Sequence, residues 1–175
     1  VTGVQTCALP ISLCERRYME LMQAKVGLIE EHEEDAALIQ DLLGLMQQSR
    51  ADYTNCFRAL GAFSSAEGSL NEPLRDCFLD RAAFDAWAGR YAARLRGEQS
   101  RDEERRIRMN RVNPKYVLRN YLAQTAIEKA QQKDYSEVDR LLALLQDPYS
   151  DQPGMDAYAA APPNWGKHLS VSCSS

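Results

Sequence analysis

The chain has 175 residues, of which 45% are hydrophobic and 26% are charged, and its formal net charge is −4. This mildly acidic balance argues against nucleic acid or an anionic membrane surface as a main partner, and no apolar run approaches the ~18 residues that a membrane-spanning helix needs. Length and composition are typical of one soluble domain, or of a piece of a larger one.

The first twelve residues, VTGVQTCALPIS, are predicted not to be native protein. A natural back-translation of residues 1–11 resembles a short-read sequencing adapter read as coding DNA. A weak strand and the end of a signal peptide are the alternatives, but a signal peptide needs a basic segment and a longer apolar segment than this one. We therefore expect native sequence to begin near Leu13 and the true N-terminus to be missing.

Apolar residues recur at helical spacing along almost the whole chain, and no convincing strand-like alternation occurs, so the fold class is predicted to be all-α. Helices are expected first at about residues 15–26 and 33–49, and then after Asp52. Gly27 is a natural C-cap for the first helix and Asp52 an N-cap for the third. The Ser- and Gly-rich segment 62–71 is predicted to be a loop. The apolar stripes of the three helices carry Tyr18, Met22 and Val26, then Leu38, Leu42, Leu45 and Met46, and then Tyr53, Cys56, Phe57 and Leu60.

The second half of the chain also has a helical pattern. A short helix is expected from Pro73 through Phe78, a long one after Asp80, one from Asn113 and Pro114 to about Gln132, and one from Ser136. The long helix has the clearest amphipathic stripe, with Phe84, Trp87, Ala88, Tyr91 and Leu95. Ser136 and Asp139 resemble a capping box, and Val138, Leu141, Leu142 and Leu145 after it are expected to be buried. After Pro148 the chain is predicted to be irregular, because Pro153, Pro162 and Pro163 exclude regular helix.

No catalytic, cofactor-binding or metal-binding set can be assembled from these residues. The acidic run Glu30, Glu31, Glu33, Glu34 and Asp35 is predicted to be a solvated helix start. His32 is flanked by glutamates rather than by a nucleophile, and His168 is the only other histidine. Apart from Cys7 in the first twelve residues, the chain has four scattered cysteines, Cys14, Cys56, Cys77 and Cys173, which lack zinc-ligand spacing and suit a reducing compartment.

Arginines are frequent in residues 100–111, SRDEERRIRMNR, where a phosphate-binding patch is one interpretation. Acidic residues interleave with Arg101, Arg105, Arg106, Arg108 and Arg111 at helical pairing distances, which favours a solvated helix face instead. Arg119 lies between apolar neighbours and is expected to pair with an interior carboxylate. Residues 122–148 resemble half of a tetratricopeptide-type hairpin, but no second copy follows at the ~34-residue period.

Cys173 is the candidate redox residue. Its small neighbours Ser172, Ser174 and Ser175 leave the sulfur accessible, as thiol exchange requires. A terminal thiol without function is the alternative.

Four ordered blocks resemble the selenoprotein O family, which is also called YdiU-like. They are RADYTNCFRAL at 50–60, FLDRAAFDAW at 78–87, VNPKYVLRNYLAQTAIEKA at 112–130 and PPNWGKHLSVSCSS at 162–175. The resemblance extends over about residues 18–175. It implies that residues 13–175 are the C-terminal helical portion of a protein-kinase-like fold, with an irregular Pro-rich tail, in an enzyme that transfers AMP from ATP to Ser, Thr or Tyr hydroxyls of proteins.

The same resemblance implies ATP and Mg²⁺ as cofactors, bound by an N-terminal part that this sequence lacks, because no residue here matches the family's catalytic motifs. That missing part and protein substrates are the implied partners, without nucleic acid or membrane, in the bacterial cytoplasm. Some family members carry selenocysteine at the place of Cys173, which implies a thiol-based redox role there, with a disulfide partner expected in the missing part. Cys14, Cys56 and Cys77 are expected to be helix-packed thiols.

Two hypotheses follow from this reasoning. A piece of a larger enzyme should leave an apolar face uncovered that is larger than the few hundred Å² typical of a monomer. An autonomous all-α protein-interaction module should instead have a conventional polar surface and unfold cooperatively by itself.

Overall fold

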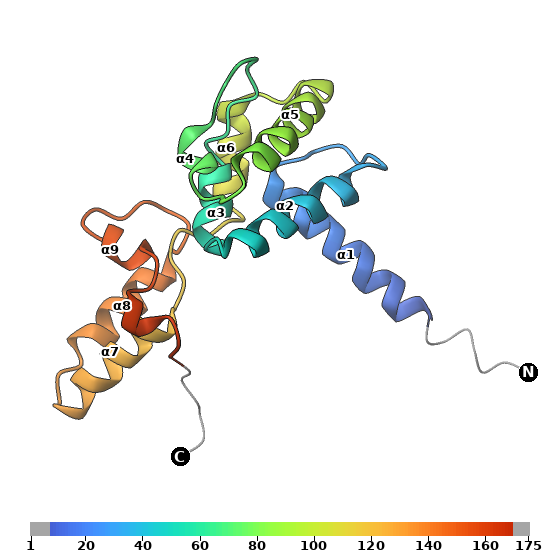
Figure 1. Cartoon of the computed structure of the whole chain (residues 1–175). Coiled ribbons are helices and arrows are strands. Elements are labelled where there is room, and N and C mark those ends of the chain that lie inside the picture. Colours follow the sequence, from blue (N-terminus) through green and yellow to red (C-terminus); the bar gives the residue numbers. More distant parts are fainter. Residues whose placement is uncertain (1–7, 170–175) are drawn as a thin grey trace, which may run out of the picture. The chain divides into compact units, whose positions relative to one another are not determined.

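The computed structural model describes residues 8–169, with side-chain burial from residue 12 onward. All regular structure in this part of the chain is helical, with nine α-helices and one short 3₁₀ helix, which confirms the all-α prediction. The chain divides between Val112 and Asn113 into two compact units, which we call unit 1 and unit 2 (Figure 1). No helix in the described residues is both long enough and apolar enough to cross a membrane.

Unit 1 contains the first six helices. They are α1 (Ala8–Val26), α2 (Asp35–Ser49), α3 (Tyr53–Leu60), α4 (Glu72–Arg75), α5 (Arg81–Gly97) and α6 (Asp102–Asn110). Helix α2 packs against α5 and α1, while α1 also contacts α3 and α6. The predicted loop at 62–71 connects α3 to α4 without regular structure.

The core of unit 1 is built around aromatic side chains of α5. Trp87 and Tyr91 lie one helical turn apart and stack with ring centroids 4.9 Å from each other. Trp87 Nε1 donates a hydrogen bond of 2.9 Å to the Leu38 carbonyl, and the Tyr91 hydroxyl donates one of 2.5 Å to the Val26 carbonyl. These rings therefore fill the core while their polar atoms tie α5 to α2 and α1.

The residues predicted to begin and end helices in unit 1 are confirmed in these roles. Asp52 Oδ1 accepts a hydrogen bond from the Asn55 amide, and Asp80 Oδ1 accepts one from the Ala83 amide, each 2.9 Å long. Gly27 follows α1 with φ +79°, a conformation that favours glycine.

Tyr18, on the apolar stripe of the first predicted helix, is 52% exposed. One prediction for unit 1 is wrong. Arg105 is not on a solvated face but is fully buried. It donates a hydrogen bond of 2.7 Å to Asp102 Oδ1 and another to the Phe63 carbonyl. Arg101 and Arg106 do make the expected pairs, with Glu104 at 2.7 Å and Glu103 at 2.9 Å.

Unit 2 contains α7 (Asn120–Gln131), α8 (Ser136–Gln146), the short α9 (Asp156–Ala159) and the 3₁₀ helix η1 (Asn164–Gly166). Helices α7 and α8 form a hairpin (Figure 1). The predicted helix start at Asn113 and Pro114 is wrong, because residues 113–119 are irregular. The amides of Lys115 and Tyr116 donate instead to the Pro148 carbonyl, at 2.8 and 3.1 Å, and Tyr116 is buried.

The predictions for α8 are confirmed only in part. Leu141 is buried, as expected, and so is Leu144, but Val138 is 42% exposed and Leu142 is 60% exposed. Tyr135, the residue before α8, makes no side-chain capping hydrogen bond, and Asp134 Oδ1 accepts one of 3.0 Å from the Ser136 amide. The exposed residues lie on a side of the hairpin that no other described element of unit 2 covers. The helical period was therefore predicted correctly, but too many of its apolar residues were expected to be buried.

Candidate functional site

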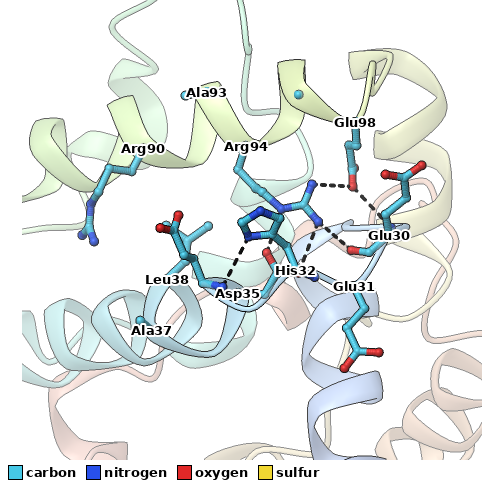
Figure 2. A pocket seen from close by; sticks show the side chains of 12 residues that line it. Glu30, Glu31, His32, Asp35, Ala37, Leu38, Arg90, Ala93, Arg94 and Glu98 are labelled. Atoms are coloured by element: carbon cyan, nitrogen blue, oxygen red, sulfur yellow. Dashed lines mark hydrogen bonds and ion pairs between the residues drawn. The ribbon is translucent and has the colours of Figure 1, made fainter.

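A pocket of about 710 Å³ lies between α5 and the connection from α1 to α2 (Figure 2). Acidic residues of that connection, Glu30, Glu31 and Glu34, lie along it with His32. Helix α5 contributes Arg90, Arg94 and Glu98 from the other side. We call this the acidic-loop pocket.

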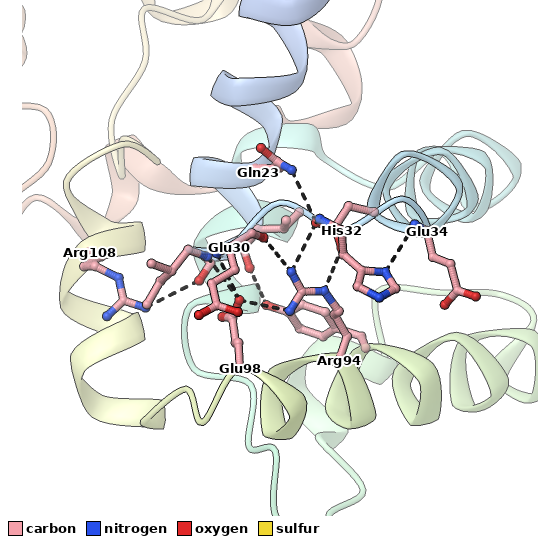
Figure 3. A network of polar contacts seen from close by, with 12 residues as sticks. Gln23, Glu30, His32, Glu34, Arg94, Glu98 and Arg108 are labelled. Atoms are coloured by element: carbon pink, nitrogen blue, oxygen red, sulfur yellow. Dashed lines mark hydrogen bonds and ion pairs between the residues drawn. The ribbon is translucent and has the colours of Figure 1, made fainter.

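Arg94 is the centre of the polar network beside the acidic-loop pocket (Figures 2 and 3). Its Nε and Nη2 bind the two carboxylate oxygens of Asp35 at 2.8 and 3.2 Å. Its Nη1 binds Glu98 Oε2 at 3.0 Å, and Nη2 also donates to the Glu30 carbonyl at 2.6 Å. The hydrogen bond to Asp35 raises the pKa of Arg94 above its ordinary value, so the guanidinium stays charged.

Asp35 is only 1% exposed, so the prediction that the whole acidic run is a solvated helix start is wrong for this residue. Besides Arg94, its Oδ2 accepts hydrogen bonds from the His32 amide at 2.9 Å and from Gln23 Nε2 at 3.3 Å. A buried carboxylate needs such partners, since burial without them carries a large desolvation cost. Asp35 thus joins α1, the connecting loop, α2 and α5.

Glu98 holds the other end of the connecting loop. Its side chain is fully buried, and Oε2 accepts from the amides of Ile29 and Glu30 at 3.2 and 3.4 Å, as well as from Arg94 (Figure 3). The second oxygen, Oε1, has no hydrogen-bond partner among the described residues. Arg94 and Glu98 are one turn apart on α5, a spacing at which opposite charges pair.

Chemically, this arrangement fixes a loop rather than activating a group. The Arg94 guanidinium is occupied by two carboxylates and a carbonyl, and the imidazole of His32 accepts from the Glu34 amide through Nδ1 at 3.4 Å. The free carboxylates at the rim, on Glu31 and Glu34, favour a cationic rather than a phosphate-bearing neighbour. Nowhere in residues 12–169 do three His, Cys, Asp or Glu side chains gather in a way that could hold a metal ion.

A second buried ionic cluster lies in unit 2, and the sequence reasoning did not identify it. Glu137 of α8 is 5% exposed and accepts from Lys129 Nζ at 2.8 Å, from Arg140 Nη1 at 3.2 Å and from the Tyr158 hydroxyl at 2.7 Å. These contacts, with Lys129 the largest cause, lower the pKa of Glu137 below its ordinary value. The cluster holds α9 against the α7–α8 hairpin.

The candidate redox residue, Cys173, lies outside the described residues. The chain leading to it is anchored on α7, where Asn120 Nδ2 donates a hydrogen bond of 2.8 Å to the Leu169 carbonyl. Gly166 fits closely against Tyr121, since a Cβ at Gly166 would lie 2.7 Å from Tyr121 Cβ. His168, between these two anchors, is exposed.

The three thiols expected to be packed in helices differ in their surroundings. Cys56 is buried in α3, and this burial raises its pKa to about 12. Cys77 is half-buried, and burial raises its pKa as well. Cys14 is exposed on α1, so the prediction is wrong for this residue.

The alternative interpretation of residues 100–111 as a phosphate-binding patch is not supported, because Arg105 is buried in the core while Arg101 and Arg106 pair on the surface of α6. Arg119 is the residue that precedes α7, rather than part of a helix, and it is half-buried. Its expected carboxylate partner stays a prediction.

The chain is similar to one protein family and to several known bacterial proteins. The model of the family described as protein adenylyltransferase SelO matches residues 11–146. A protein nucleotidyltransferase YdiU of Myxococcus xanthus is 56% identical over 158 residues, which are 90% of this chain and 32% of that protein. Relatives of the same name in Herminiimonas arsenicoxydans and Pseudomonas fluorescens are 52% and 50% identical, over 91% and 98% of this chain and 32% and 35% of theirs. The chain spans about a third of the length of these relatives.

Proposed function

The chain belongs to the protein adenylyltransferase SelO family, and we propose that it is the C-terminal helical part of an enzyme that transfers AMP from ATP to hydroxyl groups of proteins. The observation that carries this proposal is the family match over residues 11–146, together with identities of 50–56% to nucleotidyltransferases. In this proposal residues 13–175 complete a kinase-like fold, and the remaining part of a longer protein binds ATP and Mg²⁺.

The role proposed for the described residues is to position and support. Transfer of a phosphorus group depends on holding the nucleotide in place and on metal-assisted stabilisation of charge. The Asp35–Arg94–Glu98 network holds one loop against α5, and its arginine has carboxylate partners already. The network therefore supports a rigid scaffold better than a nucleotide site.

Proteins with modifiable hydroxyl groups are the proposed substrates. The experiment uses a longer protein that contains these residues and has about the full length of the relatives. It measures AMP transfer from ATP to proteins. A variant with Glu30, Glu31 and Glu34 all changed to Gln should retain its rate within about twofold, because surface substitutions away from the reacting groups have small effects. A loss of more than about a hundredfold would place catalytic groups in the acidic-loop pocket and contradict the scaffold role.

Cys173 is proposed to form a reversible disulfide with a cysteine of the remaining part of the protein. The support is the sequence around Cys173, whose neighbours Ser172, Ser174 and Ser175 are small, and the selenocysteine found at its place in related proteins. AMP transfer by the longer protein should change between reducing and oxidising buffers, and Cys173→Ser should remove the change. If the variant keeps the full redox response, Cys173 has no such role.

Residues 1–12 are proposed to be foreign to the native protein. Direct sequencing of the genomic region should show a different coding sequence immediately upstream of the codon for Leu13. Recovery of the same twelve codons would contradict the proposal.

A further inference from the structure

One side of the α7–α8 hairpin is apolar and is not covered by the other described elements of unit 2. Ile127 and Val138 are each 42% exposed there, and Leu142 is 60% exposed. Half-buried apolar residues lie between them. We call this surface the hairpin face, and it consists of Ala123, Ile127, Ala130, Val138, Leu142 and Leu145.

The contacts between the two helices show that these residues share one side. Leu122, Ala126 and Leu141 pack between α7 and α8. Tyr121 and Arg140, each one position before a packed residue, lie on the side where Tyr158 packs and accepts a hydrogen bond from Arg140 at 3.2 Å. Successive helix residues are about 100° apart, so in an antiparallel pair the residues one position after the packed ones turn to the opposite side. Ile127 and Leu142 occupy that side.

The hairpin face differs from the exposed apolar side chains of α1 in its lack of charged neighbours. On α1 the exposed Tyr18 and Leu21 have charged residues near them in the sequence. These are Arg16, Arg17 and Glu20, and both arginines pair with Glu20. In the hairpin, three charged side chains lie on the side that faces Tyr158 and bind one another and Tyr158 there, rather than on the hairpin face. They are Lys129, Glu137 and Arg140. An exposed apolar surface without charge is typical of a permanent contact rather than of a solvated helix.

We propose that the hairpin face is the surface on which a portion of the same protein, lying beyond these 175 residues, packs through an apolar and uncharged surface of its own. This inference rests on the proposed function in one respect, namely that the chain is part of a longer protein. Its support is that the matched segments make up only 32–35% of the relatives, so about two thirds of their length lies elsewhere. A face of this composition needs a cover, and that remaining length can supply one.

The test measures side-chain accessibility inside the longer protein. Leu142→Cys and Ala143→Cys are made separately, and each is treated with a thiol reagent while mass spectrometry follows the peptide that carries the substituted position. Ala143 is the matched control, because it is exposed and lies about 100° further round α8, away from the hairpin face. Native cysteines lie on other peptides and do not interfere.

The proposal expects position 142 to react at least about tenfold more slowly than position 143 in the folded protein, and both to react at equal rates in urea, because thiol modification requires access. Equal rates in the folded protein would overturn it. Slow reaction at position 142 that becomes fast on dilution, together with a dimer in sedimentation, would also overturn it, since a second copy would then be the cover.

AMP transfer by the unsubstituted longer protein is measured in parallel. If the longer protein transfers AMP and positions 142 and 143 are labelled at equal rates, the docking surface is overturned and the proposed function is not affected. Slow labelling at position 142 without any transfer supports the docking surface and counts against the proposed function.

Discussion

Single residues determine how the loop between α1 and α2 is held. Gly27 has φ +79°, and a Cβ at this position would lie 2.6 Å from Arg105 Cγ and 2.7 Å from Met109 Sδ. Gly27 therefore permits both the end of α1 and the close approach of the buried Arg105 stem. Asp35 and Arg94 then hold the far end of the same loop through two hydrogen bonds between their charged groups.

Gly27→Ala should be strongly destabilising. Gly68 is the matched control, because its φ is +76° but nothing lies within 4 Å of a Cβ built there. Gly68→Ala should lower the free energy of unfolding by about 1 kcal/mol through backbone strain alone. Gly27→Ala should lower it by a further ~1–3 kcal/mol, because the buried neighbours must move. Urea unfolding measures both, and equal losses would show that the contact with Arg105 is unimportant.

Asp35→Ala should also destabilise the protein, by about 3–5 kcal/mol, because it leaves the Arg94 guanidinium without its main partner in a buried setting. Asp41→Ala provides the control, since Asp41 pairs with Arg90 between the same two helices at 2.9 Å but both side chains are about half exposed. That change should cost less than about 1 kcal/mol. The comparison is made by chemical unfolding of the two variants, and similar losses would contradict a structural role for the buried network.

The residues of this network could not be found from the sequence. Asp35 belongs to an acidic run in which each carboxylate has the same local setting, and its partner Arg94 is 59 positions away. Arg105 was misassigned for the same reason, because its contact with the Phe63 carbonyl spans 42 positions. The local charge pattern correctly predicted the surface pairs of Arg101 and Arg106, which involve residues only three positions away.

At the scale of helices, prediction succeeded where the signal was local. Asp52 and Asp80 cap helices through hydrogen bonds to amides three residues ahead, so sequence alone was sufficient. The start of α7 was predicted six residues too early, with Asn113 rather than Arg119 as the residue before the helix. Contacts with residues far away in the sequence decide the conformation of residues 113–119. The amides of Lys115 and Tyr116 both donate to the Pro148 carbonyl, a contact more than 30 positions away that the local sequence pattern does not show.

The cluster that holds α9 on the hairpin should make stability depend on pH. The pKa of Glu137 is lowered below its ordinary 4.5, mainly by the hydrogen bond from Lys129. A carboxylate with a lowered folded-state pKa stabilises the protein above its unfolded pKa, and this contribution is lost as the pH falls through the folded value. Glu137→Gln should therefore lower the free energy of unfolding by about 1.5–3 kcal/mol near neutral pH.

The difference between Glu137→Gln and the unsubstituted chain should shrink as the pH falls below the ordinary pKa of 4.5 and through the lowered folded-state pKa, and it should be smallest once Glu137 is protonated in both states. Glu128→Gln serves as the control, since Glu128 is exposed on α7 and its side chain bonds only to Gln124 within the helix. Urea unfolding at several pH values gives the result. A difference that stays constant down to the lowest pH would contradict a charged, hydrogen-bonded Glu137.

At the scale of the whole molecule, family membership came from ordered sequence blocks rather than from a reactive site. The block at 112–130 covers the segment that leads into α7 together with most of α7, and the block at 78–87 covers the start of α5. Both include residues on which the fold depends, such as Tyr116, Phe84 and Trp87, which are at most 1% exposed. The kinase-like placement and the cofactors depend on the part of the protein beyond these residues, so they stay proposals.

The measurement that tests the account most directly supplies the longer protein with ATP labelled on either the α- or the γ-phosphate. We expect protein-bound label from the α-phosphate only, because AMP transfer retains that phosphate and releases the other two as pyrophosphate. The 175-residue chain alone should incorporate neither label. Label from the γ-phosphate only, or α-label incorporated by the short chain without the rest of the protein, would contradict the account of these helices as the supporting part of an adenylyltransferase.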